Sequence, residues 1–352
     1  MNSRERIKRM YEHRDADRVP IIDDPWQGTL RRWRNEGMPK DMPWEDYFGA
    51  DKIGTFQVDI TPRYEEKILE ENDRFYIATS KWGVTMKHFK QEDSTPEFLD
   101  FKVIDRDTWA DAKKRMTEED DRIPWDLLKN TLPKWLSEGR WIKAVFWFGF
   151  DVTHSWMMGT ENTLINMMDD PELVMDIFDT YLNRNITLYN RLWDAGYRFD
   201  ELFWYDDMGY KGTTFFSPKM YREMVKPFHA RAVKWAHDHG IVAQLHSCGD
   251  IMTLLDDIMD TGVDALNPLE VKAGMDAVAI KKKYGDRLVL RGGINAVNWS
   301  DTDKIIAEIN EKVPILKENG GFIFSSDHSI PNSVSLENMR AIMEEIKKVG
   351  KY

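Results

Sequence analysis

The feature that most limits the possible folds is an alternation of short β-rich runs with long amphipathic stretches, which begins near residue 140. Strands are predicted at residues 143–148, 201–205, 241–246, 264–267, 287–291 and 322–325. Helices are predicted at residues 171–195, 218–239, 252–259, 275–284, 302–318 and 336–349. Such alternation indicates a parallel sheet with helical crossovers. This number of units favours an α/β fold of the closed (β/α)8 type, a TIM barrel, and an open doubly wound sheet is the alternative.

The first 140 residues follow another pattern. Residues 53–105 combine alternating apolar positions with turn signals, which is typical of β-hairpins. A strand is also possible at residues 18–22. We therefore expect one TIM-barrel domain over residues 1–352, in which residues 1–140 form an N-terminal segment with a hairpin lid and residues 141–352 form the main βα repeats.

Charge and cysteine content narrow the classes of function. The net charge is -12 and the pI is about 5.3, whereas a nucleic-acid partner would need a basic surface. One cysteine excludes an intrachain disulfide and fits a reducing compartment. No apolar run approaches the ~18 residues of a membrane span. We expect a cytoplasmic protein without nucleic-acid or membrane partners; its oligomeric state is not indicated.

A candidate metal site lies at the end of the strand predicted at residues 241–246, where the sequence reads His246-Ser247-Cys248. In an extended segment residues i and i+2 point to the same side, so the imidazole and the only thiol share one location. Both are good zinc ligands, although two such residues are also typical of a buried histidine beside an inert cysteine. His328, at the end of the last strand, is the natural third ligand, or else a loop histidine hydrogen-bonded by Asp327. Glu270 is a fourth ligand, the hydrogen-bond partner of a ligand, or a salt-bridged surface carboxylate.

Polar and aromatic side chains recur at the other strand ends, where a barrel of this kind carries its chemistry. Asp206 and Asp207 are adjacent, so their side chains diverge and we expect one of them to enter the pocket. The candidate substrate-binding residues, all of which are also compatible with core or structural packing, are Trp26, Trp147, Phe148, His154, Trp204, Tyr205 and Arg291.

Over most of the chain from residue 140, the sequence resembles the uroporphyrinogen decarboxylase superfamily, and within it the zinc-dependent, corrinoid-linked methyltransferase branch. That branch carries H-x-C at a strand end, here His246 and Cys248. It also carries a late cysteine in a glycine–aromatic–serine segment before Ile-Pro, here residues 320–331, where His328 replaces the cysteine. A looser likeness covers residues 18–39. The decarboxylase's own Met-Arg-Gln-Ala-Gly pattern is absent, so porphyrinogen decarboxylation is not expected.

The resemblance implies Zn²⁺ and a corrinoid (cobalamin) carried by a partner protein. Replacing one thiolate by an imidazole leaves more positive charge on the metal, which favours an oxygen ligand. This points to the methyltransferase I component of an O-demethylase, which moves methyl from an aryl methyl ether to Co(I). Asp206, Asp207 and Glu270 are then the candidate catalytic residues, and Arg291 or His154 would hold a carboxylate or hydroxyl substituent. A transferase for another methyl donor or a thiol, a metal-free lyase with Asp206 or Asp207 as acid, and a barrel that only binds a corrinoid or tetrapyrrole are the alternatives.

Overall fold

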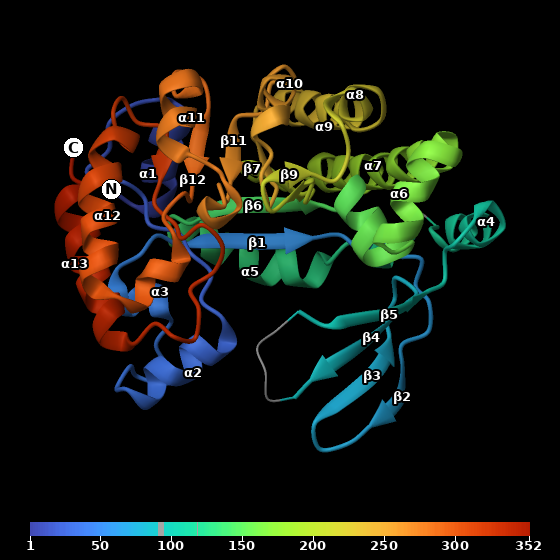
Figure 1. Ribbon diagram of the computed structural model, residues 1–352, viewed down its shortest axis with the longest axis horizontal. Helices are drawn as coiled ribbons and strands as arrows, with labels where there is room; N and C mark the ends of the chain where they lie inside the picture. The colour runs from blue at the N-terminus through green and yellow to red at the C-terminus, as the bar shows by residue number, and fades with distance from the viewer. Residues whose placement is uncertain (91–94, 118) are drawn as a thin grey trace.

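The computed structural model describes residues 1–90, 95–117 and 119–352. At its centre is a curled parallel sheet of seven strands in the order β1-β6-β7-β10-β11-β12-β13 (Figure 1). The strands are β1 (Ile53–Gln57), β6 (Trp141–Phe146), β7 (Glu201–Tyr205), β10 (Val242–His246), β11 (Ala265–Asn267), β12 (Val289–Arg291) and β13 (Phe322–Ile323). The α/β class and the parallel sheet are therefore as predicted from the alternating pattern.

Residues 20–22 contact both edges of this sheet. The amide of Phe324 donates to the carbonyl of Pro20 at 2.8 Å, and the amide of Asp51, just before β1, donates to the carbonyl of Ile21 at 2.8 Å. Pro20 has no N–H to offer to a ladder, which limits these contacts to isolated bridges. The strand predicted at residues 18–22 is thus reduced to bridges, and a fully closed eight-stranded barrel stays a prediction.

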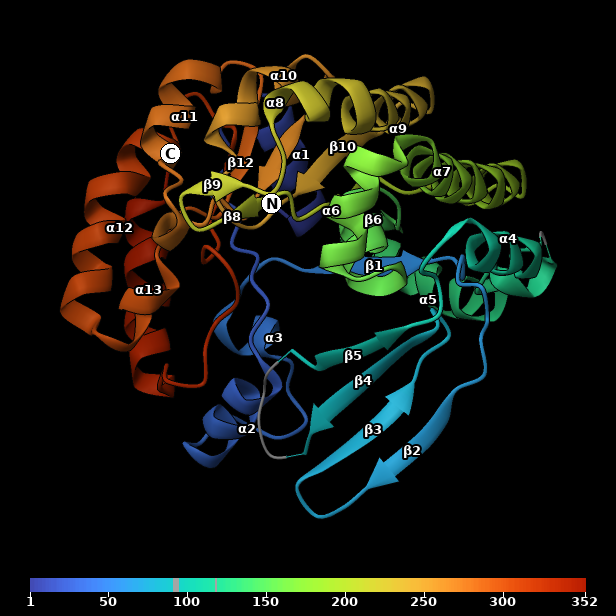
Figure 2. The ribbon, with the colours of Figure 1, turned by 45° about the vertical axis from the view of Figure 1, so that its right-hand side comes forward.

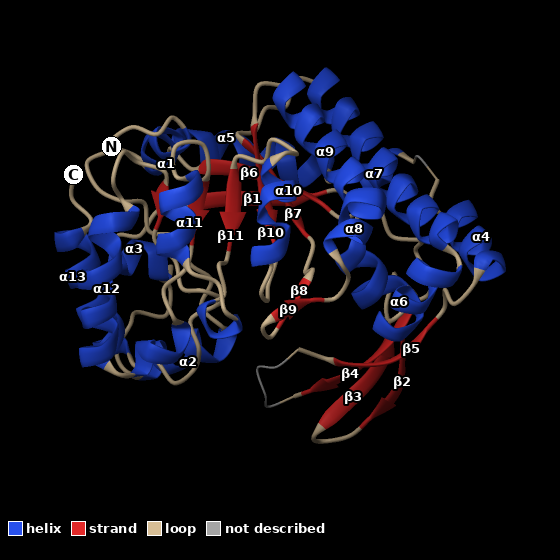
Figure 3. Cartoon of the chain, turned by 45° about the horizontal axis from the view of Figure 1, so that its top comes forward, coloured by secondary structure: helices blue, strands red, loops and turns tan. Residues whose placement is uncertain are grey.

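Helices flank the outside of the sheet (Figure 3). They are α1 (Ser3–Tyr11), α2 (Gln27–Asn35), α3 (Trp44–Phe48), α4 (Arg106–Arg115), α5 (Trp125–Ser137), α6 (Thr160–Asp169), α7 (Pro171–Asp194), α8 (Pro218–Met220), α9 (Lys226–Asp238), α10 (Leu255–Met259), α11 (Ala277–Tyr284), α12 (Thr302–Leu316) and α13 (Leu336–Val349). The helix predicted at 218–239 is split by a π-helical turn, η3 (Tyr221–Val225). Pro227, which lacks an N–H, lies two residues after the end of this turn and explains the split. No helix among the described residues is long and apolar enough to cross a membrane.

A second, antiparallel sheet stands apart from the main sheet (Figure 2). It contains β2 (Lys67–Glu71), β3 (Phe75–Thr79), β4 (Val84–Phe89) and β5 (Glu97–Phe101) in sequential order. The hairpins predicted within residues 53–105 are confirmed here, except that β1 belongs to the main sheet. A small hairpin, β8 (Gly209–Tyr210) with β9 (Thr213–Thr214), follows β7.

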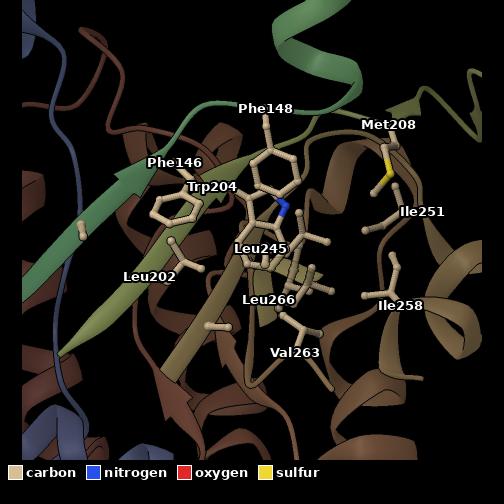
Figure 4. Packing of buried hydrophobic residues seen from close by; sticks show 14 of the residues in the cluster. Phe146, Phe148, Leu202, Trp204, Met208, Leu245, Ile251, Ile258, Val263 and Leu266 are labelled. Atoms are coloured by element: carbon tan, nitrogen blue, oxygen red, sulfur yellow. The ribbon is translucent and has the colours of Figure 1, made fainter. Parts of the chain in front are cut away.

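The hydrophobic core fills the space between the sheet and its helices (Figure 4). Leu202 and Trp204 of β7 and Leu245 of β10 point into it and are fully buried. Because successive strand residues face opposite sides, Phe203, Tyr205 and His246 point to the inside of the curled sheet. The inner face is therefore free to carry a site.

Candidate metal centre at the carboxyl end of the sheet

Three side chains of ligand type converge where β7 and β10 end. Asp207 follows β7, His246 is the last residue of β10, and Cys248 lies two residues further on. Their ligand atoms all lie within 4.8 Å of one another; Cys248 Sγ is 3.3 Å and Asp207 Oδ1 is 3.6 Å from His246 Nε2. A carboxylate oxygen, an imidazole nitrogen and a thiol sulfur fit zinc, and three such ligands leave one coordination position open.

Asn267 fixes the orientation of the His246 ring. The Asn267 Oδ1 atom, at the end of β11, lies 2.6 Å from His246 Nδ1. An amide oxygen only accepts, so Nδ1 carries the proton and the lone pair of Nε2 faces Cys248 and Asp207. Burial lowers the pKa of His246, partly offset by the Asp207 carboxylate, and this keeps the imidazole neutral. Neutral imidazole is the form that binds a metal.

Hydrogen bonds from the backbone hold the turn that carries Cys248. Its amide donates to Asp207 Oδ1 at 2.7 Å, and the amide of Gly249 donates to Glu270 Oε2 at 2.7 Å. Gly249 has φ +79, and a Cβ there would lie 2.1 Å from the carbonyl carbon of Gly209, so only glycine fits. Burial, and then Asp207 and Glu270, raise the pKa of the Cys248 thiol. A bound cation would be needed to ionise this thiol at neutral pH.

Glu270 lies beside the cluster and is not part of it among the described residues. Its Oε1 is 3.2 Å from Lys272 Nζ, while its other oxygen holds the Cys248 turn. Glu270 and Cys248 together line a pocket of about 350 Å³ that also includes Tyr210 and Lys272. Cys248 is therefore reachable from the surface, and Glu270 supports the turn.

The structure does not bring His328 into the cluster. Its side chain is exposed, and its ring stacks on Trp26 with the centroids 6.4 Å apart. The preceding residue, Asp327, is buried and its carboxylate accepts hydrogen bonds from the amides of Val271 and Ala296, which fixes the loop with His328 facing out. Trp26 and His328 line a pocket of about 590 Å³ instead. The third side chain of ligand type in the cluster is therefore that of Asp207 and not that of His328.

The two neighbouring aspartates diverge, as expected, but Asp206 does not reach the pocket. It is fully buried, with one oxygen 2.7 Å from the amide of Asp151 and the other 2.6 Å from His229 Nε2. His229 Nδ1 in turn lies 3.0 Å from the Tyr221 hydroxyl. This corrects the prediction that Asp206 is a catalytic candidate: both of its oxygens are used inside the protein.

Two of the predicted substrate-binding aromatics belong to the core. Phe148 and Trp204 are fully buried beneath the helices, with ring centroids 5.9 Å apart (Figure 4). Trp204 precedes Tyr205 on β7 and must therefore face the opposite side of the sheet. These two predictions are corrected for that reason.

Trp147 and Tyr205 do lie near the cluster. The ring of Tyr205 is 4.8 Å from that of His246 and 5.2 Å from that of Trp147. Trp147 also lines a pocket of about 570 Å³, next to Trp82 of the antiparallel sheet's β3–β4 turn. Burial raises the pKa of Tyr205 to about 12, so its hydroxyl is protonated at neutral pH. Together the two rings form an aromatic surface beside the candidate metal ligands.

His154 lies in a π-helical turn, η2 (Val152–Met157), with Nε2 3.5 Å from Asp151 Oδ1 and Nδ1 3.1 Å from the Thr160 hydroxyl. Burial, followed by the charges of Asp207 and Asp206, raises the pKa of Asp151 well above its usual range. Asp151, Asn267 and His229 were not among the site residues predicted from the sequence. Only Asn267, at a strand end before a proline, carried a signal that could have identified it.

Arg291 ends β12 and points into the curled sheet. It is only 4% exposed, and its Nη2 lies 3.2 Å from Asp24 Oδ2. His246 pairs with Asn267 of β11, and the pairing of Leu266 with Leu290 aligns Arg291 with Asn267, so the Arg291 side chain is on the same inner face as His246.

Comparison with known proteins agrees with this geometry. The family model for uroporphyrinogen decarboxylase (URO-D) matches residues 150–349. A uroporphyrinogen decarboxylase of Pelodictyon phaeoclathratiforme is 29% identical over 139 residues, which is 36% of this chain and 37% of that protein. The methylcobamide:CoM methyltransferase MtaA of Methanosarcina barkeri is 31% identical over 130 residues, 36% of each chain. These curated relatives are thus matched over only about a third of their length.

A solved methyltransferase structure from Methanosarcina mazei shares the fold. It superposes with a TM-score of 0.63 at 16% identity and covers 99% of both chains. The likeness extends over the N-terminal segment as well as the region matched by the family model.

Proposed function

Because this chain belongs to the uroporphyrinogen decarboxylase family, we propose that it is a zinc-dependent methyltransferase that moves a methyl group to the Co(I) corrinoid of a partner protein. The observation that supports this most is the Asp207–His246–Cys248 cluster, with Asn267 holding the His246 tautomer. The relative MtaA, whose name describes a methylcobamide methyltransferase, favours methyl transfer over decarboxylation. Zinc bound at these residues would act as a Lewis acid toward an oxygen that gains negative charge.

We further propose that the methyl donor is an aryl methyl ether. In such a transfer the methyl group would pass to the reduced corrinoid of the partner protein, which would supply the electron pair of the new bond. The electron pair of the broken C–O bond would stay on the ether oxygen, which would then take a proton. Tyr205 stands beside His246 and keeps its proton at neutral pH, so it can donate to that oxygen. Tyr205 and Trp147 offer flat apolar surfaces on which an arene can stack.

The test combines metal content with methyl transfer. Purified protein is expected to hold about one zinc per chain and, with free cob(I)alamin and a panel of methoxylated arenes, to produce the absorption spectrum of methylcobalamin. His246→Ala and Cys248→Ala should lose both properties. His237→Ala, which removes a partly exposed imidazole on α9, is the matched control and should keep them.

Two results would contradict this proposal, and each would favour a different function. Release of CO2 from a carboxylated substrate by zinc-free protein would favour the metal-free lyase. Tight corrinoid binding without methyl transfer from any ether, thiol or alcohol donor would favour a protein that only binds the corrinoid.

A further inference from the structure

A buried arginine inside the curled sheet has an unused hydrogen-bonding edge. Within the described residues, Arg291 Nε is buried and has no hydrogen-bond partner. Its Nη2 makes a single 3.2 Å contact to Asp24, a carboxylate whose side chain is 73% exposed. A guanidinium binds a carboxylate best through two parallel N–H donors, such as Nε with Nη2. Asp24 uses only one of them, and an exposed ion pair of this kind contributes little.

The distance between Arg291 and the Asp207–His246–Cys248 cluster matches the length of a small aromatic ligand. β10, β11 and β12 are consecutive neighbours, and His246 aligns with Asn267 of β11. Two strand spacings of ~4.8 Å put Arg291 about 10 Å from His246 along the sheet. Tyr205 of β7 pairs with His246 on the side away from β11 and β12, so its ring lies at the cluster end of this span. A benzene ring with an ether at one end and a carboxylate at the other spans such a distance.

A second buried cation, Lys143, adds positive charge near Arg291. Lys143 of β6 is 7% exposed, and its Nζ lies 4.0 Å from the centroid of the Phe203 ring. Among the described residues it makes no ion pair, and burial followed by the charge of Arg291 lowers its pKa to about 8. The nearby Glu201 accepts hydrogen bonds from Trp141 Nε1 at 2.5 Å and from the Tyr11 hydroxyl at 3.3 Å. The two cations therefore have two carboxyl groups near them: Glu201, which is already engaged, and Asp24, whose side chain is mostly exposed.

We propose that Arg291, supported by Lys143, binds the carboxylate of the aromatic substrate, and that Asp24 occupies this position until the substrate displaces it. The substrate class is then a methoxylated aromatic carboxylate and not a neutral methoxyarene. This inference rests on the proposed function only in taking the Asp207–His246–Cys248 cluster as the end where the ether lies.

The experiment measures binding by calorimetry without any corrinoid, so it does not depend on methyl transfer. The probes are 3,4-dimethoxybenzoate, benzoate and neutral 1,2-dimethoxybenzene. Wild-type protein should bind the dimethoxybenzoate at least about tenfold more tightly than the neutral ether, as expected for a charge-assisted contact. Arg291→Gln should weaken dimethoxybenzoate binding by about 100-fold and leave the neutral ether unchanged, which also shows that the variant is folded.

Asp24→Asn separates a binding role from a structural one. Removing the competing carboxylate should tighten dimethoxybenzoate binding several-fold, whereas a purely structural pair would give no gain. Arg222→Gln, an exposed arginine that pairs with Asp257, is the matched control and should bind all probes as wild type does.

Equal affinity for the charged and neutral dimethoxy compounds, no binding of either carboxylate, or an unchanged affinity in Arg291→Gln would each overturn the inference. Methyl transfer from a neutral ether would survive those results, so the proposed function would stand. Conversely, selective carboxylate binding without any methyl transfer would leave the anion site in place and remove the proposed function.

Discussion

The hydrogen bond between Asn267 and His246 should control metal affinity. The 2.6 Å contact to Nδ1 is what directs the Nε2 lone pair toward Cys248 and Asp207. Asn267→Leu removes the acceptor in a buried position and frees the ring to rotate or to protonate Nε2. Loss of such a partner typically lowers metal affinity by about 10- to 100-fold, or about 1.4–2.7 kcal/mol.

Asn267→Asp is the matched variant, because it keeps an oxygen that accepts from His246 Nδ1–H. Both variants lose the 3.4 Å hydrogen bond that Asn267 Nδ2 donates to the carbonyl of Arg291, so this loss cannot explain a difference between them. The assay is competition for zinc against a chromophoric chelator at fixed pH, with thermal unfolding of the metal-free proteins as the control for folding. Asn267→Asp should bind zinc at least as tightly as wild type. If Asn267→Leu bound zinc as tightly as Asn267→Asp while His246→Ala bound none, the argument from the tautomer would be refuted.

Three further outcomes are expected. Asp207→Asn should lower zinc affinity in the same chelator assay whereas His328→Ala should not, and the reverse order would restore His328 as the third ligand. Phe148→Ala should reduce the free energy of unfolding by about 3–5 kcal/mol, measured in urea, because it empties a core position; a change in ligand binding without loss of stability would place Phe148 back in the pocket. Burial raises the pKa of Asp23 to about 6, so its protonation favours the folded state: this stabilisation is complete below the unfolded pKa near 4 and is lost as the pH rises through 6. Asp23→Asn should therefore remove up to about 3 kcal/mol of pH dependence between pH 4 and 7, and parallel stability curves for both proteins would contradict this.

Much of the fold could be predicted from local sequence patterns. The strand at 201–205 and the helix at 336–349 have the predicted bounds, since apolar runs and caps are local signals. The pairing of His246 with Cys248 followed from the two-residue period of a strand.

What could not be predicted depends on contacts between distant segments. Asp207 joins His246 only because β7 pairs with β10 in one register. Trp204 and Tyr205 could not be told apart, because a strand buried on both faces is apolar throughout and does not reveal its inner side. The outward position of His328 is set by the hydrogen bonds that Asp327 makes to two other loops.

Asp206 and Asp207 are adjacent and chemically identical, but they lie in different environments. Asp206 is buried against His229, whereas Asp207 lies beside His246 and Cys248. Neither can replace the other, since a shift of one residue in the pairing of β7 would exchange their faces. A one-residue insertion or deletion in β7 would thus bury the ligand and expose the structural carboxylate without altering the local composition. The candidate metal centre therefore depends on the length of β7 more than on its amino-acid composition.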